Sequence, residues 1–147
     1  MSHIRITKIF RFEMAHALWN YEGKCKNIHG HSYVLYVTLS GTPVNEKGHP
    51  EDGMLMDFGK LKKLIQKQVV DEFDHTFVIN ENSPQADNLI NSNLPFENIK
   101  KLPFQPTSEN LIMHFAEKIK STLPENLNLH SLKLSETDTS YVEWFGD

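Results

Sequence analysis

Hydrophobic and polar residues alternate along two stretches near the start of the chain. Between residues 4 and 17 the even positions are largely apolar, with Lys8 as the interruption, and several odd positions are polar. Residues 33–41 alternate in the same way, from Tyr33 onward. Side chains two residues apart on a strand point to the same face, so this period of two predicts two long half-buried strands.

Two later stretches follow a helical period instead. Apolar residues recur every three or four positions over residues 58–73 and again over residues 111–119. This spacing predicts two amphipathic helices, each with one face on the core. Asp57 stands before the first helix, and Thr107 or Ser108 before the second, as predicted N-caps.

Two more strands are predicted near the C-terminus, at residues 132–136 and 141–145. The order β-β-α-α-β-β predicts an α+β fold, with an antiparallel sheet and two helices on one face. We expect a single domain over residues 1–147, without a repeat. Residues 80–106 are rich in Asn and Pro and are expected to form a long irregular insertion, with a short helix near residues 86–91.

Composition narrows the class of protein. The chain has 147 residues, of which 39% are hydrophobic and 23% charged, and this balance is typical of a globular protein. Its net charge of -4 gives no electrostatic reason to expect nucleic acid or a membrane surface as a partner. No long apolar run opens the chain, and a single cysteine suits a reducing compartment, so we expect a cytoplasmic protein.

Three histidines lie at the ends of the two N-terminal strands. His16 continues the apolar face of the first strand, and His29 and His31 continue the apolar face of the second. If the strands pair antiparallel, all three imidazoles meet at one edge of the core. Three imidazoles with an open fourth position are typical of catalytic Zn²⁺, whereas metal-free histidine pairs are also common. The sequence therefore predicts a zinc site, with a metal-free cluster as the alternative.

Three further positions offer acid–base or binding chemistry. Cys25, the only thiol, precedes His29 by four residues and is a candidate proton-transfer group, although a lone Cys is also a common buried apolar residue. Asp74 can orient His75 for proton transfer, or His75 can simply interact with the helix dipole. Glu136 ends an apolar strand face, which suits either a solvated strand end or bidentate recognition of an amidine-like ligand edge.

The order and spacing of these motifs resemble the superfamily of 6-pyruvoyltetrahydropterin and 6-carboxytetrahydropterin synthases. The matching segments span almost the whole chain and comprise residues 12–16, 25–31, 56–58, 74–75, 106–110 and 133–137. The resemblance implies a tunnelling fold that oligomerises into a barrel. It also implies a homo-oligomer of trimers stacked into hexamers, with each pocket at a subunit boundary.

The resemblance assigns a role to each candidate residue. It implies Zn²⁺ ligands at His16, His29 and His31, a proton acceptor at Cys25, an assisting pair at Asp74 and His75, a pterin anchor at Glu136, and pocket-lining residues at Thr107 and Ser108. Three residues separate Cys25 from His29, and this spacing favours the bacterial queuosine-pathway branch of the superfamily.

Members of that branch convert 7,8-dihydroneopterin triphosphate to 6-carboxy-5,6,7,8-tetrahydropterin, with release of acetaldehyde and triphosphate. Three alternatives stay open at this point. They are the 6-pyruvoyl reaction, which eliminates triphosphate and keeps the carbon chain; a generic zinc hydrolase; and a non-catalytic zinc- or pterin-binding protein.

Overall fold

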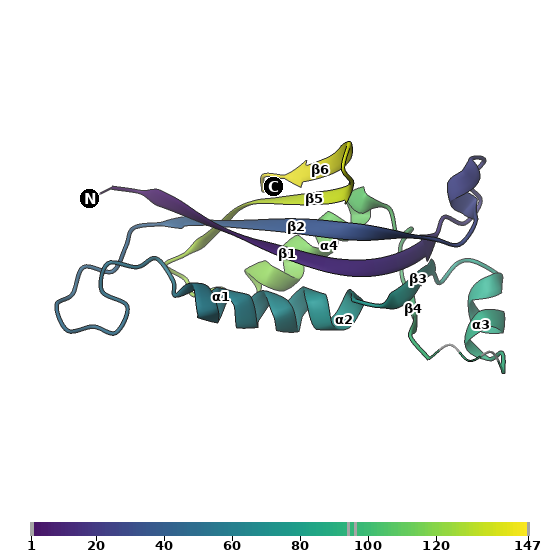
Figure 1. The fold of residues 1–147 in the computed structure, drawn as a ribbon, viewed down its shortest axis with the longest axis horizontal. Helices are drawn as coiled ribbons and strands as arrows, with labels where there is room; N and C mark the ends of the chain where they lie inside the picture. The colour runs from purple at the N-terminus through teal and green to yellow at the C-terminus, as the bar shows by residue number, and fades with distance from the viewer. Residues whose placement is uncertain (1, 94, 96, 147) are drawn as a thin grey trace.

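The fold is built on two long paired strands, seen in a computed structural model that describes residues 2–93, 95 and 97–146. β1 (Ile4–Ala17) and β2 (His29–Gly41) run antiparallel along the length of the molecule (Figure 1). Their register places Phe12 opposite Tyr33 and His16 opposite His29. Both predicted strands and their antiparallel pairing are therefore confirmed.

Four shorter strands complete a six-stranded sheet in the order β4-β3-β1-β2-β5-β6. β5 (Asn128–Thr137) and β6 (Ser140–Trp144) form the predicted C-terminal hairpin and join the sheet beside β2. On the other side, β3 (Thr76–Asn80) pairs with β1 and β4 (Ile99–Leu102) pairs with β3, both in parallel. The sheet is therefore mixed, which corrects the expectation of a purely antiparallel sheet.

One of the two missed strands lies within the segment that was expected to be irregular, and the other ends where that segment begins. Residues 80–106 contain the predicted short helix, α3 (Gln85–Ile90), but also β4. β3 is buried over residues 78–80 without alternation, and β4 is four residues long with two adjacent lysines. Neither strand carries the period of two that marks a half-buried strand, so the hydrophobic pattern gave no signal for them.

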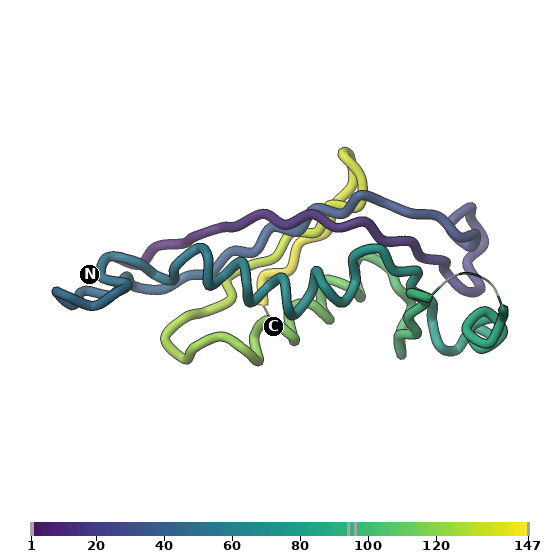
Figure 2. The backbone as a smooth tube through the Cα atoms, turned by 60° about the horizontal axis from the view of Figure 1, so that its bottom comes forward, coloured from purple at the N-terminus to yellow at the C-terminus, as the bar shows by residue number. Residues whose placement is uncertain are grey.

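Two helical stretches cover one face of the sheet (Figure 1). The first runs through α1 (Phe58–Ile65), a π-helical turn (Gln66–Val70) and α2 (Asp71–Phe73), and the second is α4 (Ser108–Lys120). Both predicted caps are present, because the side chains of Asp57 and Thr107 accept hydrogen bonds from the backbone N–H groups of Lys60 and Asn110. Figure 2 shows the sheet arching over the helices.

The core lies between the helices and the concave face of the sheet. Its largest fully buried side chains are Tyr33, Phe12, Phe73, Phe115, Leu35, Leu39, Leu61, Ile65, Leu111, Ile119, Leu132 and Leu134. Burying each aliphatic or phenylalanine side chain contributes about 1.5–3 kcal/mol. The opposite face of the sheet is open and carries exposed polar residues such as Arg11, Glu13 and Ser32. Among the described residues, no helix has both the length and the apolar character needed to cross a membrane.

Candidate metal centre and active site

Three imidazoles converge where β1 ends and β2 begins, on the helix-covered face of the sheet. The ligand atoms of His16, His29 and His31 all lie within 4.8 Å of one another, and their ring centroids are 4.6–5.3 Å apart. The antiparallel register produces this cluster, because His16 is paired with His29 and Met14 with His31. The sequence-predicted convergence of the three histidines is confirmed, and the cluster can hold a metal ion.

Backbone carbonyls fix the orientation of two of these rings. His16 Nδ1 lies 2.6 Å from the carbonyl oxygen of Pro106, and His29 Nδ1 lies 2.8 Å from that of Asn27. A carbonyl oxygen only accepts, so each Nδ1 must carry the proton that it donates. Each Nε2 is then the free lone-pair nitrogen, as metal-ligating histidines require.

The nitrogen positions fit one shared ion. His16 Nε2 and His29 Nε2 lie 3.1 Å apart. Two nitrogen ligands that are each about 2.0–2.1 Å from a tetrahedral Zn²⁺ lie about 3.3 Å from each other. Two unprotonated nitrogens this close repel each other in the absence of a cation, so the arrangement suits a bound divalent metal.

Burial favours the neutral, metal-binding form of two of the three imidazoles, those of His16 and His31. Removal from water lowers the pKa of His16 below its usual value of 6.5, and the neighbouring charges of His29 and His31 lower it further. Desolvation also lowers the pKa of His31, with Glu136 acting in the opposite direction. Metal ions compete with protons for imidazole nitrogens, so a depressed pKa favours metal binding at neutral pH.

Glu136 faces the mouth of the cluster from β5. One carboxylate oxygen, Oε1, lies 3.6 Å from His16 Nε2 and 3.5 Å from His31 Nε2. Since both imidazoles have lowered pKa values, these contacts join a carboxylate to neutral rings rather than forming strong ion pairs. The structure therefore brings this predicted residue directly to the histidine cluster.

Cys25 lies in a 3-10 turn (Lys24–Lys26) immediately before β2, and it is half-buried. Its carbonyl oxygen accepts a hydrogen bond of 2.9 Å from the N–H of Leu18, which ties the turn to the end of β1. Burial raises the pKa of the Tyr33 hydroxyl, and smaller contributions in the same direction come from Glu136 and then Cys25. The thiol is thus held at the same end of the sheet as the cluster.

Tyr33 is a residue of the site that the sequence interpretation did not single out. It is fully buried, and its ring lies edge-on to His16 and His31 at centroid distances of 6.3 and 5.6 Å. Burial is the main reason that its pKa is raised well above the usual value. A signal was available, since Tyr33 has the same strand parity as His29 and His31.

Asp74 and His75 form a second group at the junction of α2 and β3. Asp74 Oδ1 lies 3.0 Å from His75 Nδ1 and accepts a hydrogen bond of 2.8 Å from the N–H of Glu13. The N–H of His75 in turn donates to the carbonyl oxygen of Glu13 at 2.6 Å. Burial raises the pKa of Asp74, but these hydrogen bonds outweigh it and hold the pKa below its usual range.

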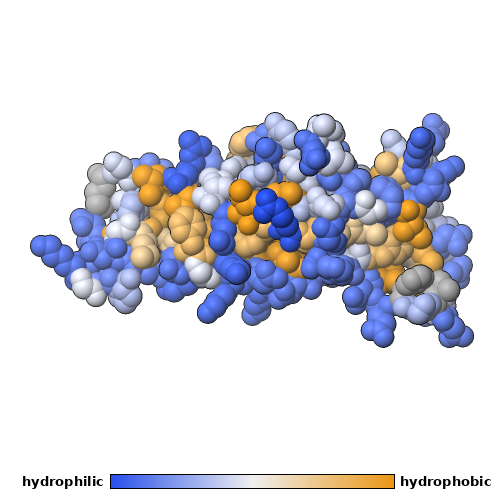
Figure 3. All heavy atoms as spheres, in the orientation of Figure 1, coloured by the Kyte–Doolittle hydropathy of each residue, from blue (hydrophilic) through white to orange (hydrophobic). Residues whose placement is uncertain are grey.

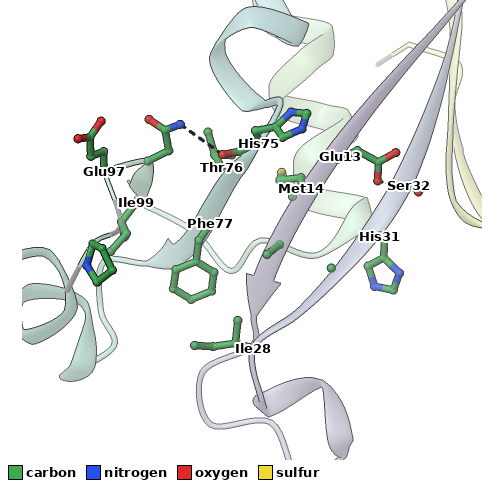
Figure 4. Close-up of a pocket in the computed structure, with 14 residues that line it drawn as sticks. Glu13, Met14, Ile28, His31, Ser32, His75, Thr76, Phe77, Glu97 and Ile99 are labelled. Atoms are coloured by element: carbon green, nitrogen blue, oxygen red, sulfur yellow. Dashed lines mark hydrogen bonds between the residues drawn. The ribbon is translucent and has the colours of Figure 1, made fainter.

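A cavity of about 670 Å³ lies beside this pair on the sheet (Figure 4). Its lining includes both His31 and His75, together with Ser32, Phe77 and Ile99. The cavity is mainly apolar, and Figure 3 shows apolar side chains at this end of the molecule as well as elsewhere along its length. It can accept a flat organic ligand with polar groups at its edges.

Thr107 and Ser108 begin α4 next to the carbonyl that supports His16. Thr107 caps the helix through its hydroxyl, which accepts from the N–H of Asn110 at 3.2 Å. Ser108 is buried, and its hydroxyl has no hydrogen-bond partner among the described residues. The predicted N-cap at Thr107 therefore has a structural role as well as a position near the cluster.

The curled sheet and the helices on its concave face define a tunnelling-fold protein, and its three-histidine cluster could hold a metal ion. A family profile described as 6-pyruvoyl tetrahydropterin synthase matches residues 5–147. The chain belongs to this family.

Relatives and solved structures agree with that assignment. The chain is 34% identical to 6-carboxy-5,6,7,8-tetrahydropterin synthase from Haemophilus influenzae, over 95% of this chain and 97% of the relative. It is also 34% identical to the enzyme of the same name from Aquifex aeolicus, over 95% and 96% of the two chains. The structure of Caenorhabditis elegans 6-pyruvoyl tetrahydropterin synthase is similar with a TM-score of 0.70 and 27% identity, over 100% of this chain and 98% of that chain.

Proposed function

We propose that this protein is a zinc-dependent lyase that converts 7,8-dihydroneopterin triphosphate to 6-carboxy-5,6,7,8-tetrahydropterin, a step of queuosine biosynthesis. The observation that carries the proposal is the cluster of His16, His29 and His31 with the Glu136 carboxylate at its mouth. The relatives named 6-carboxy-5,6,7,8-tetrahydropterin synthase support this branch. So does the three-residue spacing between Cys25 and His29.

The proposed reaction uses one water molecule. The first side-chain carbon stays on the ring and becomes the carboxylate, with an oxygen from water. The two outer carbons leave as acetaldehyde, and triphosphate is released. The dihydropterin ring is reduced to the tetrahydro form as that first carbon is oxidised, so no external oxidant or reductant is needed.

The residues of the chain divide the work of this reaction. Zn²⁺ held by the three imidazoles would polarise the side-chain hydroxyls of the substrate and make the neighbouring C–H groups more acidic. Cys25, as a thiolate, accepts a proton from the side chain. Glu136 accepts hydrogen bonds from the amidine-like edge of the pterin and keeps the reacting carbons near the cluster.

Two further groups complete the proposed site. His75, oriented by Asp74, returns or shuttles a proton. The family resemblance assigns Thr107 and Ser108 to the lining of the pterin pocket, although neither borders the cavity beside Asp74 and His75. With these assignments the three imidazoles bind metal, while the thiol and the exposed imidazole exchange protons.

We also propose that the chain is a single domain that works as a cytoplasmic homo-oligomer, in trimers stacked into hexamers. The open polar face of the sheet and its two free edge strands, β4 and β6, support this, because barrel closure would pair the edges. Each pocket would then lie at a subunit boundary, and residues 80–106 would lie near it.

The test is product analysis. We expect the zinc-loaded protein incubated with 7,8-dihydroneopterin triphosphate to yield acetaldehyde and the 6-carboxy product by mass spectrometry, and the chelator-treated protein to yield neither. Substrate consumption without acetaldehyde would refute the lyase assignment. Unchanged substrate at full zinc loading would instead indicate a non-catalytic zinc- or pterin-binding protein.

A second candidate is the 6-pyruvoyl reaction, in which triphosphate is eliminated and the carbon chain is kept. The name of the matching family profile and that of the C. elegans structure favour it. The same incubation separates the two reactions, because only the lyase releases a two-carbon aldehyde.

A further inference from the structure

The hydroxyl of Tyr33 is buried without a partner. The side chain is fully buried, and its ring stacks on Phe12 at a centroid distance of 5.2 Å and an interplanar angle of 9°. Among the residues that the structure describes, none forms a hydrogen bond with this hydroxyl. A buried hydroxyl without a partner destabilises the folded state, and phenylalanine would fill the same space without that cost. The hydroxyl therefore calls for a role beyond packing.

The surroundings of this hydroxyl belong to the candidate site. The β2–β5 register ends with Val34 opposite Ser135, so Tyr33 and Glu136 each lie one residue beyond the last paired position of two neighbouring strands. After burial, the charge of Glu136 is the next cause of the raised pKa of Tyr33, ahead of Cys25. Glu136 is therefore the favoured hydrogen-bond acceptor of the two.

Glu136 and Tyr33 share two neighbours, the imidazoles of His16 and His31. Glu136 Oε1 lies 3.6 and 3.5 Å from their Nε2 atoms, and the Tyr33 ring lies edge-on to both rings. The lone-pair Nε2 of His16 offers the carboxylate no proton, whereas the Tyr33 hydroxyl is a buried donor without a partner among the described residues. An O–H donor to a carboxylate makes a short, charge-assisted hydrogen bond.

We propose that Tyr33 is a positioning residue whose hydroxyl donates a hydrogen bond to Glu136 and holds that carboxylate toward the pterin when the ligand is bound. This inference rests on the proposed function, because it names the residue that orients Glu136, the proposed pterin anchor. It assigns different roles to the two parts of the side chain. The ring packs against the imidazoles, and the hydroxyl orients the residue that binds the ligand.

The variant Tyr33→Phe removes the hydroxyl and keeps the ring. Since the hydroxyl has no partner among the described residues, we expect the thermal midpoint of the metal-free protein to stay the same or rise. Tyr36→Phe is the matched control, because Tyr36 lies on the open face of β2, where its ring is near the Lys133 ammonium. A clear fall in the thermal midpoint of metal-free Tyr33→Phe would overturn the proposal, since it would reveal a structural role.

Ligand binding gives the second readout. We expect zinc-loaded Tyr33→Phe to bind biopterin, an unreactive pterin, about tenfold more weakly than wild type by fluorescence titration, as expected for a lost hydrogen bond to a charged group. KM for the substrate should rise by a similar factor while kcat changes less than about threefold. Tyr36→Phe should match wild type in both measurements.

A double-mutant cycle identifies the partner. In a Glu136→Ala background, which removes the acceptor oxygens, the Tyr33→Phe change should have little further effect on biopterin affinity, whereas in a Cys25→Ala background it should keep its full effect. Additive effects with Glu136→Ala would overturn the proposal, as would unchanged biopterin binding by Tyr33→Phe. If wild type itself neither binds biopterin nor turns over substrate, the proposed function fails and this inference fails with it.

Discussion

Two histidine sites in this chain use the same side chain in opposite environments. His16 is 1% exposed and donates to a backbone carbonyl, and burial lowers its pKa. The His75 side chain is 75% exposed and lies against the carboxylate of Asp74. A buried imidazole held neutral is suited to binding a metal ion, whereas an exposed imidazole paired with a carboxylate is suited to proton exchange. Environment, rather than residue type, separates the two proposed roles.

Among the changes that test this comparison, loss of one imidazole from the cluster should have the largest effect on zinc binding and turnover. We expect His29→Ala to lower zinc affinity by more than about 10²-fold, because outer partners of metal ligands alone are worth up to that much. Turnover should disappear with the metal. Zinc content by elemental analysis after dialysis is the measurement. His130→Ala, which alters a histidine on β5 that contacts Arg5, is the control and should keep its zinc.

The thiol should separate proton transfer from metal binding. We expect Cys25→Ala to lower kcat by about 10³-fold, within the range for a lost acid–base group. Zinc content and biopterin affinity should remain at wild-type values, because the three imidazoles and Glu136 are untouched. Wild-type turnover by Cys25→Ala would remove the role that we assign to the thiol.

The exposed imidazole should matter for rate and not for metal. His75 has a φ of 60°, in the left-handed region that asparagine tolerates better than most residues. His75→Asn therefore removes the imidazole with little backbone strain, and we expect kcat to fall about 10²-fold at unchanged zinc content. Loss of zinc from this variant would show that His75 contributes to metal binding, and it would contradict separate roles for the two histidine sites.

The lowered imidazole pKa values also predict a pH dependence of stability. His16, His31 and His114 all have pKa values held below 6.5 by burial. As pH falls below 6.5 the unfolded chain takes up protons on these groups first, so the free energy of unfolding decreases. Urea denaturation of the metal-free protein should show this loss between pH 7.5 and 5. A flat profile would contradict neutral buried imidazoles, and His114→Gln should reduce the slope only in part.

The histidine cluster could be predicted from the sequence because the alternation that marks the two strands also places the three histidines on one face. His16, His29 and His31 occupy the apolar parity of two alternating strands, so antiparallel pairing alone brings them together. β3 and β4 could not be predicted in this way, because apolar and polar residues do not alternate along these short parallel strands.

The contacts that support the histidine cluster could not be predicted from the sequence either. The Pro106 carbonyl accepts a hydrogen bond from the imidazole of His16, which lies 90 residues earlier in the chain. Only the tertiary fold brings these two groups together. The contact between Glu136 and the cluster likewise depends on the β2–β5 pairing, which the pattern of a single strand does not specify.

X-ray absorption at the zinc edge of the zinc-loaded protein tests the central claim most directly. We expect three imidazole nitrogens at about 2.0–2.1 Å and one further light-atom ligand, with no sulfur at about 2.3 Å. A sulfur in the coordination sphere would make Cys25 a ligand rather than a base. Fewer than three imidazoles would contradict the shared site at the ends of β1 and β2.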